Sequence, residues 1–256
     1  MNLRNIFRSI PFLKRIYPSL FLKFSYLLNK NIFLSKFKNV YLNLDIRDPI
    51  DRSVLLFNFY EEEQIKYLIG LFKKNKINYF FDVGANCGIY SLVISKLFPK
   101  TSTLSFEPVK STFKKLEKNF SLNPKLKNMK KYNYGLSNKN SKLKMKALFK
   151  KNFIQSGGYG VVNNKDNLKN LHTEFALFKK GDGKFTYKNK TICLKIDVEG
   201  HEIFVLNGLK KIFKNNKIFL QIEIFPNNLT KINRWLKNFN FIKINKINSD
   251  YYFKNK

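Results

Sequence analysis

A short apolar run that leads directly into a glycine-containing turn constrains the fold of this chain most. Residues 79–81 are aromatic, residues 82–88 read D-V-G-A-N-C-G, and an apolar helix is expected over residues 89–98, ending before Pro99. Glycines in such a turn let backbone N–H groups at a helix N-terminus approach a ligand closely. The pattern predicts a buried strand followed by a nucleotide-like binding turn.

Alternating strands and helices extend this unit along the chain. We expect strands at residues 40–46, 103–106, 129–134, 191–196, 218–224 and 241–247, and helices at 61–74, after a cap at Ser111, at 203–213 and at 229–238. Such alternation predicts a mostly parallel, doubly wound α/β sheet with helices on both faces. Residues 141–190 interrupt it, and we expect a loop-rich insertion there, with an extra strand through Leu143, Met145 and Ala147.

The chain of 256 residues is long enough for one such domain with an extension. We divide it into an N-terminal basic arm and strand, residues 1–53, and a main domain, residues 54–256. Residues 3–37 are rich in Phe and Leu, and basic residues such as Arg4, Arg8 and Lys14 interrupt every apolar run. Neither a signal peptide nor a membrane span is therefore expected. A helical arm packed on the core is favoured over an interfacial helix on an anionic membrane through residues 1–38.

The formal net charge of +32 is extreme. It would suit nucleic acid or an anionic membrane surface. The lysines are spread over the whole chain, however, and Lys, Asn, Ile and Phe are enriched together, which favours a bias toward A/T-rich codons. We expect no specific nucleic-acid partner. Cys87 and Cys193 match no disulfide or metal spacing, which suits a reducing cytoplasm. The interfacial alternative for residues 1–38 would place the protein peripherally at the inner membrane surface.

Two acidic residues narrow the ligand of the turn. Asp82 precedes the first glycine, where a carboxylate would repel a pyrophosphate, and the turn lacks the G-x-G-x-x-G dinucleotide pattern. Glu107 follows the next strand and could accept both ribose hydroxyl hydrogens. A cationic nucleoside without phosphate fits both features, and S-adenosylmethionine is one. A plain glycine turn and a solvated strand-end acid are the simpler alternatives.

A charged cluster, K-I-D-V-E-G-H-E, spans residues 195–202. If the strand stays extended to Glu199, then Lys195, Asp197 and Glu199 share one face at the carboxyl edge of the sheet, where open α/β sheets bind ligands. Glu223 ends the following strand on the same edge. The alternative is a structural ion pair between Lys195 and Asp197.

These motifs, together with F-E-P at 106–108 and G-L-S at 135–137, resemble the FkbM-type methyltransferase family over about residues 54–247. The resemblance implies a class I methyltransferase (Rossmann-like) fold, S-adenosylmethionine as donor, and O-methylation of a hydroxyl, frequently on a sugar of a glycan or glycolipid. It also implies the cofactor-binding residues: Asp82, Gly84, Asn86 and Gly88 for the methionine part, Glu107 for the ribose, and Leu136 and Ser137 near the adenine.

A sugar hydroxyl is a poor nucleophile, so a general base is expected. Asp197 is the first candidate, and His201 is the second, although His201 could equally be an exposed residue of the first helical turn. Lys195 could hold Asp197 ionised or bind an anionic substrate. A metal held by Asp197 and Glu223 is disfavoured, because no further ligands are evident, and no metal is expected.

Two rival functions remain. A nucleic-acid methyltransferase is disfavoured because D-V-E-G at 197–200 stands where base N-methylating enzymes usually carry an Asn/Asp-Pro-Pro-aromatic motif. The other rival is a non-catalytic, membrane-associated module that keeps the fold.

Overall fold

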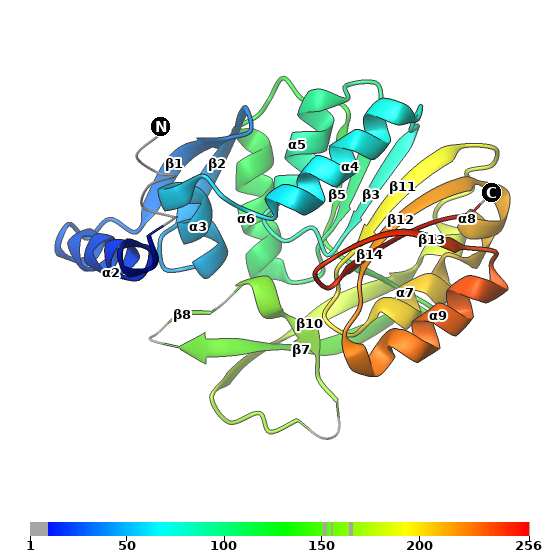
Figure 1. The fold of residues 1–256 in the computed structure, drawn as a ribbon. Coiled ribbons are helices and arrows are strands. Elements are labelled where there is room, and N and C mark those ends of the chain that lie inside the picture. The colour runs from blue at the N-terminus through cyan, green and yellow to red at the C-terminus, as the bar shows by residue number, and fades with distance from the viewer. Residues whose placement is uncertain (1–9, 151–152, 155, 164–165, 256) are drawn as a thin grey trace.

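A central seven-stranded sheet organises the molecule (Figure 1). The computed structural model describes residues 10–150, 153–154, 156–163 and 166–255. The strand order is β13-β14-β12-β11-β3-β4-β5, in which β14 alone runs antiparallel to its neighbours. The strands are β3 (Tyr79–Val83), β4 (Ser102–Phe106), β5 (Met129–Tyr132), β11 (Thr191–Ile196), β12 (Lys217–Glu223), β13 (Ile242–Ile247) and β14 (Asp250–Lys254). The predicted mostly parallel, doubly wound sheet is confirmed; β14 was not predicted.

Helices cover both faces of this sheet (Figure 1). They are α4 (Glu62–Lys74), α5 (Ile89–Leu97) and α6 (Lys110–Ser121) on one face, and α7 (Glu202–Gly208), α8 (Lys210–Asn215) and α9 (Leu229–Asn238) on the other. Because strand residues alternate in direction, Phe80 packs in the first of these layers and Phe81 in the second. Each face of the sheet therefore has its own apolar core.

Two helix predictions need correction. Ser111 does not cap α6, since Val109 precedes the helix and the Ser111 hydroxyl donates to Glu174 Oε1 at 2.8 Å instead. The single helix expected over 203–213 is divided into α7 and α8. At the break, a Cβ on Gly208 would lie 1.9 Å from the carbonyl oxygen of Ser137, so the glycine allows the chain to pass against that strand.

The insertion contributes four strands, joined by loops, to a second sheet, whereas the sequence analysis expected one extra strand there. This sheet comprises β6 (Gly135–Ser137), which precedes the insertion, and β7 (Ser141–Lys150), β8 (Phe153–Ile154), β9 (Gly160–Val161) and β10 (Leu171–Lys180) within it, of which β7 confirms the expected extra strand. Strand β10 was missed because Phe175 and Leu177 are exposed while Ala176 and Phe178 are buried. Apolar residues on both faces hide the period of two on which strand recognition depends.

The N-terminal arm contains helix α2 (Pro11–Leu27), a hairpin of β1 (Ile32–Phe37) and β2 (Val40–Asp45), and helix α3 (Pro49–Phe57). Residues 1–9, with Arg4 and Arg8, lie outside the described residues. The strand at 40–46 is confirmed as β2, whereas β1 was not predicted. Helix α3 crosses the boundary we drew between residues 53 and 54. No helix in the described ranges combines the length and apolarity that a membrane crossing requires.

Candidate functional site

The predicted glycine turn connects β3 to α5 and packs against the loop that follows β11. Gly84 has φ +83°, and a Cβ there would lie 1.8 Å from the backbone oxygen of Asp197. The Asp197 N–H donates to the carbonyl oxygen of Val83 at 3.0 Å. Both the conformation and the close approach require glycine. The D-V-G-A-N-C-G and K-I-D-V-E-G motifs therefore contact each other directly through their backbones.

A cavity of about 230 Å³ opens beside this turn, between the central sheet and the insertion. It lies where the strand order diverges from β3 toward β4 on one side and β11 on the other, which is where doubly wound sheets bind ligands. The described residues that line it include six carboxylates and one lysine: Glu61, Asp82, Glu107, Asp197, Glu199, Glu223 and Lys195. In a chain with a net charge of +32, an acid-lined cavity is suited to a positively charged ligand.

Lys195 is buried at the floor of this cavity and ionised. Its ammonium Nζ lies 2.8 Å from Asp197 Oδ2 and 4.8 Å from the ring centroid of Tyr90. Burial lowers the pKa of Lys195, but the charges of Asp197 and Glu61 outweigh that effect and raise it. Burial likewise raises the pKa of Asp197, and Lys195 reverses this to hold it below its usual range. Lys195 and Asp197 thus form the ion pair that the sequence analysis considered.

Two further cavity residues were missed by the sequence analysis. The Tyr90 hydroxyl donates to Glu61 Oε2 at 2.5 Å, and both side chains line the cavity. Glu61 is the first of three consecutive glutamates at the start of the helix expected over residues 61–74. It has φ +39° and stands outside the helix, which begins at Glu62. A left-handed residue of this kind leaves no signal in the hydrophobic period.

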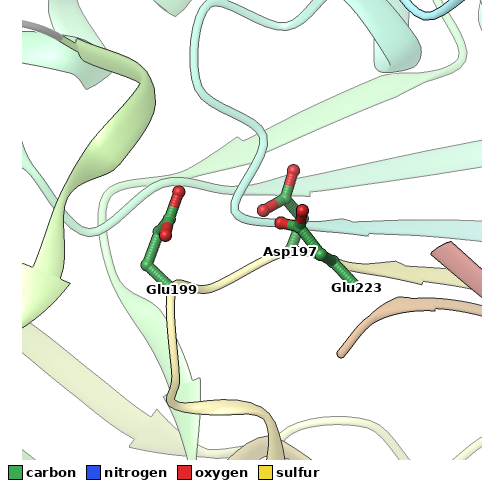
Figure 2. Close-up of side chains that lie close together, drawn as sticks. All are labelled: Asp197, Glu199 and Glu223. Atoms are coloured by element: carbon green, nitrogen blue, oxygen red, sulfur yellow. The ribbon is translucent and has the colours of Figure 1, made fainter. Parts of the chain in front are cut away.

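Three carboxylates meet where the loop after β11 approaches the end of β12, as Figure 2 shows. One oxygen from each of Asp197, Glu199 and Glu223 lies within 4.8 Å of the other two. Strand β11 ends at Ile196 and Glu199 has φ +49°, so the expectation of an extended strand to Glu199 was wrong. The turn nevertheless brings the Glu199 carboxylate to the cluster.

Two of these three acids, Glu199 and Glu223, are weakened by burial and by the neighbouring charge of Asp197. Burial, followed by the charge of Asp197, raises the pKa of Glu199 to about 7 and that of Glu223 to about 8. The cluster can therefore hold a proton, attract a cationic ligand or supply oxygen ligands to a divalent ion. Lys195 already neutralises one of the three carboxylates, which weakens the case for a metal.

Glu107 borders the cavity, but both of its carboxylate oxygens accept hydrogen bonds from backbone N–H groups. Its carboxylate accepts from the N–H of Asn86 at 3.0 Å and of Val109 at 2.9 Å, and burial raises its pKa to about 7. It therefore fixes the turn in addition to facing a ligand. The Asn86 Oδ1 atom is buried at the cavity wall without a hydrogen-bond partner among the described residues. That free acceptor fits the ammonium or hydroxyl hydrogens of a nucleoside that carries an amino acid.

The other predicted cofactor residues divide into two groups. Gly84 and Leu136 line the cavity, as does Asp82, whose Oδ2 accepts from the N–H and hydroxyl of Ser91 at 3.1 and 2.6 Å and so secures α5. Gly88 and Ser137 do not line it. Gly88 lies behind the turn, where a Cβ would come within 3.0 Å of Phe120.

Ser137 instead faces a second, more open cavity of about 1,020 Å³, which adjoins the first. The two cavities share Val161, Glu199 and His201. Residues of the insertion and of the turn at η3 (Pro226–Asn228) complete its wall. A ligand in the second cavity would reach the carboxylate cluster from the side of the insertion.

His201 is buried, so the alternative of an exposed residue in the first helical turn was wrong. It precedes α7, its Nε2 hydrogen-bonds with Ser137 Oγ at 2.9 Å, and its ring stacks on Phe204 at 4.6 Å and lies 5.0 Å from Phe178. Burial lowers its pKa to about 4. At neutral pH the imidazole is uncharged and a weak base, which fits a hydrogen-bonding role better than proton acceptance.

The sheet order, the glycine turn and the acid-lined cavity at the switch point together define a class I methyltransferase architecture. The chain belongs to the methyltransferase FkbM domain family, which it matches over residues 82–243, more than half its length. It is accordingly an S-adenosylmethionine-dependent methyltransferase, as the resemblance implied. Comparison with curated proteins yields no match.

Solved structures with a similar course of the chain are distant in sequence. A precorrin-6y C5,15-methyltransferase from Geobacter metallireducens is 10% identical, with a TM-score of 0.44 over 77% of this chain and 88% of that one. TYW2 from M. jannaschii in complex with AdoMet is 10% identical, with a TM-score of 0.45 over 88% of this chain and 84% of that one. A human methyltransferase 10 domain containing protein is 12% identical, with a TM-score of 0.45 over 93% of this chain and 95% of that one. These values are too low to transfer a substrate.

Proposed function

We propose that this protein transfers a methyl group from S-adenosylmethionine to a hydroxyl oxygen, on a sugar of a glycan or glycolipid. The observation that carries the proposal is the position of Glu199, which belongs to the Asp197–Glu199–Glu223 cluster of the acid-lined cavity and also lines the larger second cavity. A donor cation on one side and a hydroxyl on the other would then meet beside groups able to accept a proton.

The chain's own residues supply alignment and proton transfer. The cofactor supplies, when bound, a methyl group on a sulfonium, which leaves as a neutral thioether when the new C–O bond forms. Asp197, kept ionised by Lys195, accepts a hydrogen bond from the hydroxyl and orients its oxygen. Glu199, with a pKa of about 7, takes the proton that the hydroxyl loses, because a base works best with a pKa near the working pH.

The wall of the second cavity supports a neutral, hydroxyl-rich acceptor. Phe204 and Phe225 present partly exposed aromatic faces there, and Asn138, Asn227 and Asn228 offer amide donors and acceptors. Aromatic faces pack against the C–H face of a sugar while amides bond its hydroxyls. Lys139 is the one cationic side chain among the described residues lining this cavity, which does not favour a phosphate-rich strand.

Methyl transfer to unknown acceptors can be followed with S-adenosylmethionine carrying an isotopic label in its methyl group. The protein is incubated with cell extract that is then separated into glycan, lipid, RNA and protein fractions, and Asp197→Asn serves as the blank. We expect label in the glycan or glycolipid fraction, stable to base as an ether is. Enzyme-dependent label in RNA or protein instead would replace the proposed acceptor class. The absence of label from every fraction would favour a non-catalytic module that keeps the fold.

A further inference from the structure

Helix α2 carries an apolar face that no part of the described chain covers. Phe12, Ile16, Leu20, Phe24 and Leu27 recur every three or four residues and are all exposed, with Leu20 at 59% and Phe24 at 56%. Residues at this spacing form one stripe along a helix. The helix lies at the edge of the molecule, away from the central sheet (Figure 1). An apolar stripe of this length on a solvent-exposed surface marks an interaction site.

The opposite face of α2 holds the helix on the fold. Tyr17 and Phe21 are half-buried; the Tyr17 ring lies 6.2 Å from that of Phe57 in α3, and the Phe21 ring 5.7 Å from that of Phe33 in β1. Ser25 is buried beside them. One side of the helix is thus docked and fixed, and the exposed stripe is presented outward in a defined orientation.

The charges around the stripe are of one sign. Lys14, Arg15 and Lys23 are exposed on α2, and Lys30 follows its end. No Asp or Glu precedes Asp45 in the sequence. Lysine and arginine side chains can extend from an apolar face to reach charged headgroups. A second copy of this chain would bring two basic arms together and repel, whereas an anionic bilayer supplies the opposite charge.

We propose that the outer face of α2 docks this protein on an anionic lipid surface, with the Phe12–Leu27 stripe entering the interface and the basic residues contacting headgroups. A helix of 17 residues is about 25 Å long, enough to lie in the plane of the interface but not to cross the bilayer. Docking is independent of methyl transfer. It would place the membrane one helix from the cofactor cavity, because α3 packs on α2 and contributes Ile50 to the cavity wall.

The test must separate docking by the stripe from attraction by overall charge. The full chain is floated with vesicles of phosphatidylcholine and phosphatidylglycerol in roughly equal parts at about 0.15 M salt. The test variant is Leu20→Ser with Phe24→Ser, which leaves the net charge unchanged. The matched control is Leu97→Ser with Ile242→Ser, at positions 44% and 57% exposed on α5 and β13. Circular dichroism melting checks that both variants fold.

We expect the wild type and the control to float, and the test variant to lose at least tenfold in vesicle partitioning. Vesicles of phosphatidylcholine alone should bind the wild type weakly, because the headgroup charge is then absent. Equal flotation of test variant and control would show binding by net charge alone and overturn the proposal. So would a wild type that fails to float but sediments as a dimer that the test variant converts to monomer, since the stripe would then be a contact between copies.

Discussion

The backbone oxygen of Asp197 occupies the space in which a side chain on Gly84 would begin, since a Cβ there would lie only 1.8 Å away. Two motifs more than a hundred residues apart are thereby held in register. Gly84 also has φ +83°, a conformation that a non-glycine residue adopts only at a cost.

Gly84→Ala should therefore destabilise the protein by roughly 2–4 kcal/mol, combining left-handed strain and overpacking. Gly70, inside α4 with no atom within 4 Å of a built Cβ, provides the matched control. Gly70→Ala should be neutral or stabilising by about 0.5–1 kcal/mol. Urea unfolding followed by circular dichroism measures both, and equal stability of the two variants would show that the loop after β11 yields easily.

Asp197→Asn should lower turnover by roughly 10²–10⁴-fold while S-adenosylmethionine still binds, because the variant keeps the side-chain shape but loses the charge that orients the acceptor. Removing one partner of a buried pair leaves Lys195 uncompensated, so the variant should also melt at a lower temperature. Calorimetric titration measures binding and the labelled-methyl assay measures turnover. Retained turnover would place the essential carboxylate elsewhere in the cluster.

Glu199 is expected to set the pH dependence of the reaction. Burial raises its pKa to about 7, so it becomes a free carboxylate, able to take a proton, only as the pH rises through that value. With S-adenosylmethionine saturating, we expect kcat/KM for the acceptor to rise with pH across this range, and the limb to be absent in Glu199→Gln. His201→Gln serves as the comparison, because the imidazole, with a pKa of about 4, does not titrate there. A limb that disappears in the His201 variant instead would reverse these roles.

Glu107→Ala should weaken S-adenosylmethionine binding at least tenfold. The substitution removes a carboxylate from the cavity wall and leaves the N–H groups of Asn86 and Val109 without the acceptor that Glu107 provides. Glu117→Ala, at a partly exposed glutamate on α6, controls for the loss of one negative charge. Binding is measured by calorimetric titration at a temperature where both variants remain folded. Unchanged affinity would remove Glu107 from the cofactor site.

Cofactor binding should release protons near pH 7. Glu107, Glu199 and Glu223 have pKa values of about 7, 7 and 8, so each is partly protonated in the free protein. A bound cation favours the ionised carboxylates and lowers these values, so affinity should increase as the pH rises from 6 toward 8. Titration in buffers of different ionisation enthalpy counts the protons. Proton uptake would show that the ligand's cationic groups lie away from these acids.

The central sheet and the gathering of acids at its carboxyl edge could be predicted from sequence because they depend on local signals. Strands β3 and β11 contain the short apolar runs Tyr79–Phe81 and Ile192–Leu194, and charged residues stand near the end of each, where parallel strands end at one edge. The acids that follow such strands must meet there whatever the loops do. For that reason Asp197, Glu199 and Glu223 converge although the expected extension of β11 is absent.

The surroundings of His201 could not be predicted, because they depend on a strand with no clear pattern. Its ring is covered by Phe178 of β10, whose apolar residues face both ways and conceal its period. Once β10 was missed, the second cavity and the burial of His201 were missed with it. The double role of Glu107 was equally hidden, since hydrogen bonds to the N–H groups of Asn86 and Val109 depend on the three-dimensional course of two loops.

The acid-lined cavity in a chain of net charge +32 has a consequence for the speed of cofactor capture. At a distance, S-adenosylmethionine, which has a net positive charge, meets a repulsive field, and the attraction of the cavity acts only within the last few ångströms. Added salt screens the long-range field over about 8 Å at physiological strength but leaves the buried carboxylates little changed. Association of the cofactor should therefore accelerate with ionic strength, whereas anionic molecules would be captured more slowly under the same change.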